Sequence, residues 1–200
     1  MSEAEELETV SAITELAEYY KGIYTILSSC ASRQLEEVTF RRGVVQVNEL
    51  FECASKYFRN SMKGKMFAVN LHIDSSEAKV TGDFILLRFL LESLIDEALS
   101  VPLDGELYLD AKPDGEYIRF SFTDKRRTKT LEELNQLFYP ELNRMTTNIA
   151  KGDLKETEYL ICKQIIRDHD EFAGRRGCRI IAEPAEEGFT VCFTVPVRNK

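Results

Sequence analysis

The sequence is short of histidine and of positive charge, and each shortage excludes a class of function. Only two histidines occur among the 200 residues, too few for a histidine-rich metal site. The 26 lysine and arginine residues are outnumbered by 34 aspartate and glutamate residues, which leaves a net charge of −8 and a pI near 5. Nucleic-acid binders gain affinity by neutralising phosphates, so this charge balance argues against one.

The sequence predicts neither a signal peptide nor a membrane-spanning segment. Residues 1–8 are acidic, whereas a signal peptide needs a basic start. The most apolar run, residues 84–95, contains Arg88 and Glu92 and is too short to span a bilayer. We expect a cytoplasmic chain, either free or as the cytosolic portion of a membrane-anchored receptor, with cysteines that are reduced and structural. Those cysteines are odd in number and follow no metal-like spacing: Cys30, Cys53, Cys162, Cys178 and Cys192.

Hydrophobic periodicity indicates an α+β chain. The expected helices are 9–30, 47–62, 83–99, a short one ending at Phe138, and 154–169. The expected strands are 66–73, 76–82, 105–112, 116–123, 177–183 and 188–196. We expect 66–73 and 76–82 to pair as a hairpin, and 32–45 to be a link. Helices can cover one face of a mixed sheet, so the prediction is a two-layer α/β sandwich preceded by a long N-terminal helix.

Three segments follow one another in an informative order. Gly82-Asp83 opens the long helix, a later strand ends in Asp124, and a helix over 154–169 precedes the last two strands. This order and spacing resemble the catalytic, ATP-binding domain of sensor histidine kinases, in the superfamily that includes gyrase, the heat-shock chaperone and the mismatch-repair ATPases. The resemblance implies a histidine-kinase-like ATPase fold over residues 41–200. It also implies that residues 1–40, a helix and a link, resemble the second helix of the family's dimerisation hairpin.

The resemblance locates a nucleotide pocket whose residues are largely replaced. Glu97 stands where the family has a Mg²⁺-binding Asn, and Asp124 is kept where an Asp accepts a hydrogen bond from adenine. Arg126 stands at a glycine position of the Asp-x-Gly-x-Gly motif that follows that Asp. The positions that match the family's pocket are Ser93, Glu97, Asp124, Arg126, Thr128, Glu156 and Glu158.

The replacements predict a pocket that does not bind nucleotide. Glu156 and Glu158 replace two glycines that would offer backbone N–H groups to phosphates, and two carboxylates there repel a triphosphate by roughly 1 kcal/mol or more each. We expect Glu97 to lie on an exposed acidic edge of its helix. The basic run 125–127 is expected to be a solvated loop, with the alternative that Arg126 occupies the base pocket.

The leading functional prediction is therefore a non-catalytic signalling module, a pseudokinase of two-component type. We expect no catalytic residue, no metal, no cofactor, no nucleic acid, a protein signalling partner, and a homodimer. The dimer would form through the N-terminal helix, by Ile13, Leu16, Tyr20, Ile23 and Leu27. The alternative is a histidine kinase or ATPase with a remodelled pocket that binds ATP and Mg²⁺.

The positions of the histidines bear on a third possible function, that of a phosphotransferase. A phosphotransferase that has lost ATP binding needs an acceptor histidine, and none precedes His72. His72 lies in an expected strand, where we expect it to have a packing role. His169 matches the family's usual helix-terminal histidine.

Overall fold

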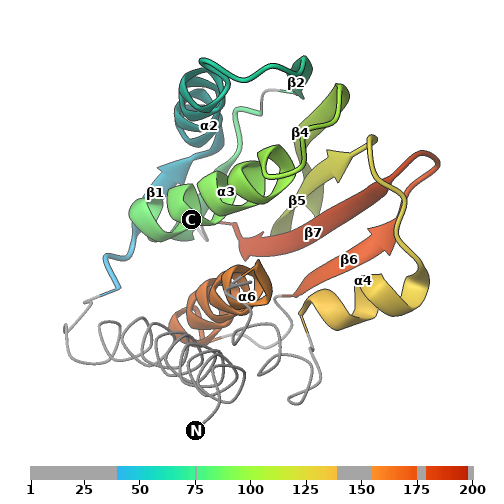
Figure 1. Ribbon diagram of the computed structural model, residues 1–200. Helices are drawn as coiled ribbons and strands as arrows, with labels where there is room; N and C mark the ends of the chain where they lie inside the picture. The colour runs from blue at the N-terminus through green and yellow to red at the C-terminus, as the bar shows by residue number, and fades with distance from the viewer. Residues whose placement is uncertain (1–39, 75, 139–154, 175–178, 198–200) are drawn as a thin grey trace, which may run out of the picture. The chain divides into compact units, whose positions relative to one another are not determined.

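A five-stranded mixed sheet forms one layer of the computed structural model, which describes residues 40–74, 76–138, 155–174 and 179–197 (Figure 1). The strand order is β2-β4-β5-β7-β6. These strands span Val69–Ile73, Gly105–Asp114, Tyr117–Asp124, Phe189–Pro196 and Ile180–Pro184, in that order. β2 pairs with β4 in parallel, and the other neighbours pair antiparallel. Phe40–Phe138 and Tyr159–Lys200 form one compact unit.

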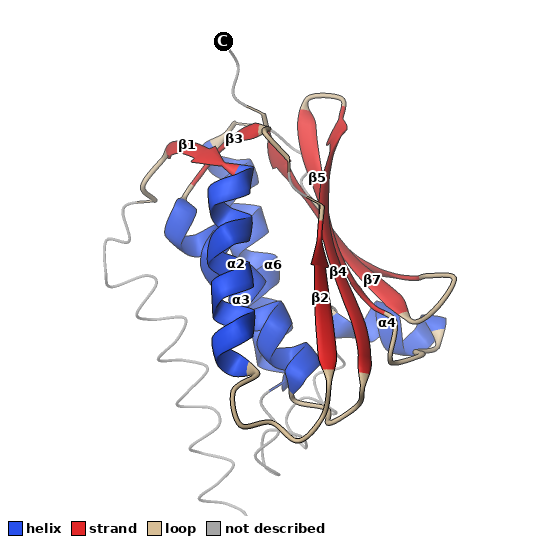
Figure 2. Cartoon of the chain, turned by 90° about the horizontal axis from the view of Figure 1, so that it is seen from above, coloured by secondary structure: helices blue, strands red, loops and turns tan. Residues whose placement is uncertain are grey.

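Three helices cover one face of this sheet: α2 (Val47–Ser61), α3 (Phe84–Leu99) and α6 (Lys155–Phe172) (Figure 2). Their apolar sides and the facing side of the sheet share one hydrophobic core, in which Phe51, Phe120 and Phe193 are fully buried. A shorter helix, α4 (Leu131–Leu137), contacts β6 and begins with a capping box between Thr130 and Glu133. The predicted α+β class and two-layer sandwich are confirmed.

One strand pairing was predicted wrongly. β3 (Lys79–Gly82) does not form a hairpin with β2 but pairs antiparallel with β1 (Gly43–Gln46), whose first three residues lie in the predicted link. Val45 and Val80 are both buried in this small second sheet. Meanwhile β2 takes β4 as its partner, and a parallel pair of this kind needs the long crossover that α3 provides.

Side chains on β5 alternate between the two faces of the sheet. Ile118, Phe120, Phe122 and Asp124 are buried on the helix-covered face. The intervening residues are only partly buried and lie on the other face, as the two-residue period of a strand requires. β5 therefore ends with a carboxylate directed into the layer between sheet and helices.

The predicted N-terminal helix, its five dimer residues and the segment 1–40 lie outside the described residues, apart from Phe40. Among the residues that are described, no helix combines the length and the apolar character needed to cross a membrane.

Candidate functional site

The long helix α3 supplies the first part of the site. Asp83 caps its N-terminus by accepting hydrogen bonds from the backbone N–H groups of Ile85 and Leu86, at 2.9 and 3.2 Å. The backbone N–H of Asp83 in turn donates to Nε2 of His169 on α6, at 3.0 Å. These bonds fix the helix, and its last turn carries Glu97 into the buried layer.

The end of β5 supplies the second part, because the loop that follows Asp124 turns back onto it. Arg126 donates from its backbone N and from Nε to Oδ1 of Asp124, both at 2.9 Å, and from Nη2 to Oδ2, at 2.9 Å. The same guanidinium donates to the carbonyl oxygens of Ala98, at 2.7 Å, and Leu103, at 3.1 Å. Only 1% of either charged side chain is exposed, so this is a buried ion pair.

Arg127 joins the two parts. Its Nη1 and Nη2 donate to Oε1 and Oε2 of Glu97, at 2.9 and 2.6 Å, while its Nε donates to Oδ2 of Asp124, at 2.7 Å. The guanidinium also lies 5.3 Å from the ring centroid of Phe189. A planar guanidinium binds two carboxylates at once in this way because its N–H groups form a rigid fork. We call Glu97, Asp124, Arg126 and Arg127 the arginine network.

All acceptor capacity of Asp124 is used within the arginine network. An ionised carboxylate offers about four lone-pair sites, and here four N–H groups donate to the two oxygens of Asp124. Each oxygen of Glu97 likewise accepts from Arg127. Chemically the arrangement is a self-neutralised charge cluster, in which each carboxylate oxygen accepts at least one arginine N–H.

The electrostatics of the network favour the charged forms of Asp124 and Arg127. Burial alone would raise the pKa of Asp124, but hydrogen bonds from Arg126 and the charge of Arg127 outweigh burial and lower that pKa. Burial opposes the charge of Arg127, yet Glu97 and Asp124 raise its pKa overall. Burial, with the adjacent Glu97 carboxylate, raises the pKa of Tyr159 well above its usual value. Tyr159 is therefore a neutral phenol beside the network.

Two glycines that the sequence did not single out make room for the network. Gly105 has φ of +136°, and a Cβ there would lie 2.7 Å from Cγ of Arg126. Gly188 has φ of +77°, and a Cβ there would lie 1.9 Å from the carbonyl oxygen of Asp124. Both positions accept glycine alone, since other residues rarely adopt such φ values and the space is already filled.

Two predictions about exposure are wrong at this site, one of them only in part. Glu97 does not lie on an exposed acidic edge: its side chain is 9% exposed, because Arg127 covers it, whereas its neighbour Asp96 is exposed. The run 125–127 is solvated only in part: Lys125 is exposed as predicted, whereas the side chains of Arg126 and Arg127 are only 1% and 11% exposed. The signal available in the sequence was the opposite charge of Glu97 and Arg127, but the two residues are 30 positions apart and their pairing has no local pattern.

The other predicted positions lie apart from the network. Ser93 is half-buried on α3 and Thr128 is exposed in the loop after Arg127. Glu156 and Glu158 stand in the first turn of α6, and their side chains lie outside the described residues. In the described part of the chain, no group of three or more His, Cys, Asp or Glu residues is placed to hold a metal ion.

The two histidines have different environments. His169 is buried at the end of α6, and burial lowers its pKa. His72 has a packing role, as predicted, but on the exposed side of β2, because residues 69, 71 and 73 take the more buried side. Its ring stacks on Tyr108 at 4.7 Å, with Nε2 lying 3.6 Å from Glu106.

The described cysteines are free, as predicted. Cys162 packs in the core, and Cys53 is half-buried. Cys192 is buried among polar groups rather than apolar ones, with Arg119 Nη2 lying 3.1 Å from its sulfur.

Comparisons with known proteins agree with this architecture. No protein-family model and no curated protein matches the sequence. The catalytic domain of histidine kinase ThkA, in a nucleotide-free form, superposes with a TM-score of 0.60 at 17% identity, over 80% of this chain and 99% of that domain. Longer ThkA, crystallised with the response regulator TrrA, gives 0.64 at 18% identity, over 99% of this chain and 53% of ThkA. Histidine kinase AdeS of Acinetobacter baumannii gives 0.58 at 14% identity, over 100% of this chain and 87% of AdeS. The chain therefore has the fold of histidine kinase catalytic domains.

Proposed function

We propose that the chain is a non-catalytic, histidine-kinase-like signalling module that acts by binding proteins in the cytoplasm. One observation carries the proposal: the carboxylate at the adenine-binding position, Asp124, accepts four hydrogen bonds from Arg126 and Arg127. A purine amino group that bonded Asp124 would have to displace one of these donors. In this proposal, arginine side chains of the chain itself take the place of the adenine base.

Approximate free energies favour the ion pairs of Arg126 and Arg127 over a bound nucleotide. Breaking a buried ion pair by removing one partner costs about 3–5 kcal/mol. A ligand with millimolar affinity has a total binding free energy of about 4 kcal/mol. Displacing Arg126 or Arg127 would therefore consume most of the binding free energy that such a nucleotide could supply.

The position expected to complete a Mg²⁺ shell supports the same proposal. Both oxygens of Glu97 accept from Arg127. A divalent cation at Glu97 would also approach the buried positive charge of Arg127, and that repulsion opposes binding. At the phosphate end, the carboxylates of Glu156 and Glu158 are proposed to act in the same direction, by repelling a triphosphate.

Nucleotide titration tests the proposal directly. We expect no saturable heat and no shift in melting temperature when the whole chain meets millimolar ATP or ADP, with or without Mg²⁺. ShkA, whose structure contains AMPPNP, is the positive control. A ligand at a hundredfold excess over Kd would stabilise the fold by about 2.7 kcal/mol, which a melting curve detects. Such a shift, lost in Asp124→Asn, would overturn the proposal in favour of an ATP-binding kinase or ATPase with a remodelled pocket.

The proposed mode of action is assembly with other proteins. ThkA, which shares this fold, was crystallised with a response regulator, and this supports a protein partner for the present chain. The proposed homodimer rests on the apolar stripe of residues 9–30, which is broad for a helix without a partner.

Light scattering on an Ile23→Glu variant tests the homodimer. We expect the variant to halve the mass of the wild-type particle, because a buried carboxylate in a helical interface lacks a partner. Thr14→Glu adds the same charge off the stripe and should leave the mass unchanged. A monomeric wild type, or an Ile23→Glu variant of unchanged mass, would contradict the proposed interface.

A further inference from the structure

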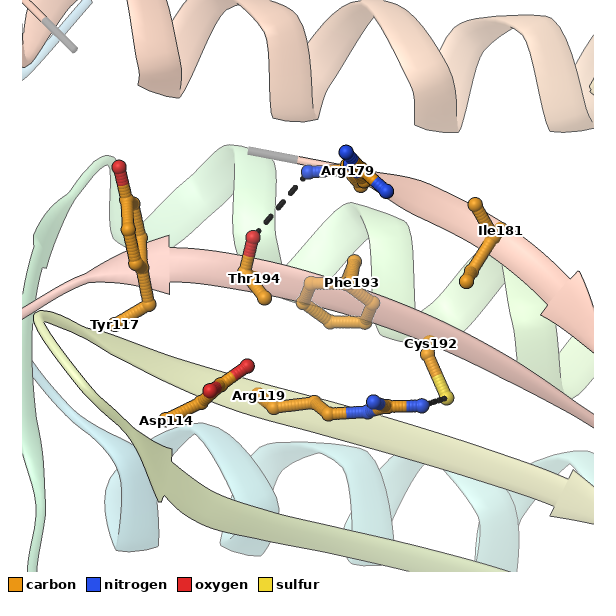
Figure 3. Close-up of a pocket in the computed structure, with 8 residues that line it drawn as sticks. All are labelled: Asp114, Tyr117, Arg119, Arg179, Ile181, Cys192, Phe193 and Thr194. Carbon is orange, nitrogen blue, oxygen red and sulfur yellow. Dashed lines mark hydrogen bonds between the residues drawn. The ribbon is translucent and has the colours of Figure 1, made fainter. Parts of the chain in front are cut away.

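A second site candidate lies on the other face of the sheet, away from α2, α3 and α6. There β5, β6 and β7 border a cavity of about 360 Å³ (Figure 3). Its lining residues are Asp114, Tyr117, Arg119, Arg179, Ile181, Cys192, Phe193 and Thr194. No member of the arginine network is among them, so what the cavity binds is independent of the proposed loss of nucleotide binding.

The two arginines of the cavity differ in their partners. Arg119 is committed: its Nη2 bonds Glu183 and lies 3.1 Å from the sulfur of Cys192, and Asp114 adds an attractive charge. The guanidinium of Arg179 makes no hydrogen bond or ion pair with any residue that the structure describes. Glu183 and Asp114 thus balance Arg119, whereas no carboxylate among the described residues pairs with Arg179.

The backbone holds Arg179 at the cavity. Its N–H donates to Oγ1 of Thr194, at 3.2 Å, and its carbonyl accepts from the N–H of Thr194, at 3.1 Å (Figure 3). The side chain of Arg179 is exposed, and its guanidinium is not paired with any residue in the described part of the chain. Its planar fork matches the geometry of a carboxylate.

The rest of the lining suits an apolar group. Ile181, on the edge strand β6, is 38% exposed, and Tyr117 at the start of β5 is half-buried. Pockets for small molecules typically measure about 300–1,000 Å³ and combine apolar walls with a few polar groups. We propose that this cavity binds a small organic carboxylate, with its anionic group on Arg179 and its apolar body against Tyr117 and Ile181.

Benzoate is the first probe, because it combines a carboxylate with an apolar ring of suitable size. The whole ¹⁵N-labelled chain is titrated with sodium benzoate at constant ionic strength, and benzamide serves as the neutral analogue. We expect saturable shifts of the Arg179 and Thr194 amide signals with benzoate, and binding of benzamide at least about tenfold weaker, since a charge-assisted pair is lost. Shifts that do not saturate, or that are equal for the two probes, would overturn the proposal.

Substitution assigns the binding to Arg179. Arg179→Gln should weaken benzoate binding about tenfold or more, and because this side chain is exposed the variant is expected to fold. Arg59→Gln removes the same charge from an exposed position on α2 and should leave binding unchanged. Equal affinities in the two variants, with unchanged melting temperatures, would show a non-specific charge effect and reject the site.

Discussion

Replacing Asp124 by alanine should lower the free energy of unfolding by about 3–5 kcal/mol, the largest effect that we expect from a single charge. The loss arises because Arg126 and Arg127 share this carboxylate in a buried layer, where an unpaired guanidinium is strongly disfavoured. Urea denaturation of the wild type and the variant measures the difference. Replacing a carboxylate that makes an ion pair on the other face of the sheet provides the control. Asp110 lies 3.4 Å from the exposed Lys112, and Asp110→Ala should cost less than about 1 kcal/mol.

The same carboxylate gives the stability a predictable pH dependence. The pKa of Asp124 is lowered in the folded state, so its contribution is present above the ordinary carboxyl pKa of about 4. That contribution is lost as pH falls through the lowered value. The stability of the wild type should therefore fall more steeply in acid than that of Asp124→Asn. Equal acid slopes, or a loss below about 1 kcal/mol for Asp124→Ala, would contradict the buried pairing.

Replacing Gly188 by alanine should destabilise the domain by about 2–5 kcal/mol. The added Cβ would lie 1.9 Å from the carbonyl oxygen of Asp124 and 2.7 Å from Cα of Lys125, so backbone must move. Overpacking of this kind typically costs about 1–3 kcal/mol, and the φ of +77° adds about 1–2 kcal/mol for a residue with a Cβ. Chemical denaturation again provides the measurement.

Gly115 separates the two causes. It also has a positive φ, of +61°, but a Cβ there would meet nothing within 4 Å. Gly115→Ala should therefore show only the conformational cost, about 1–2 kcal/mol. If the two alanine variants show the same decrease in the free energy of unfolding, the close approach between Gly188 and Asp124 does not contribute to the cost.

The elements that the sequence predicted well are those whose pattern is local. α3 was recognisable from its apolar stripe and from the Gly82-Asp83 pair that opens it, and in the structure Asp83 caps the helix. β4 and β5 correspond to the predicted strands 105–112 and 116–123, which were recognisable from their hydrophobic periodicity. Such patterns report burial of one face, and burial is what the core requires.

What the sequence did not reveal depends on partners that are far apart along the chain. The pairing of β1 with β3 could not be predicted from either strand alone, because the sequence of a short strand does not specify which strand it pairs with. Glu97 and Arg127 were each assigned to the solvent by their charge, which is the usual position of charged residues. The two side chains can be buried only because they form an ion pair with each other. That pair joins residues 30 positions apart, so it is a feature of the tertiary structure and not of the local sequence.

The hydrogen bond from the Asp83 N–H to His169 has a consequence for dynamics. The amide of a helix N-cap residue ordinarily lacks a partner in its helix and exchanges its proton with solvent readily. Here its acceptor lies 86 residues away, on α6, and both residues are buried. Exposing this proton requires α3 and α6 to separate, which is a larger opening than fraying of a helix end. The hydrogen-exchange rate of the Asp83 amide should therefore measure the slow opening of the domain.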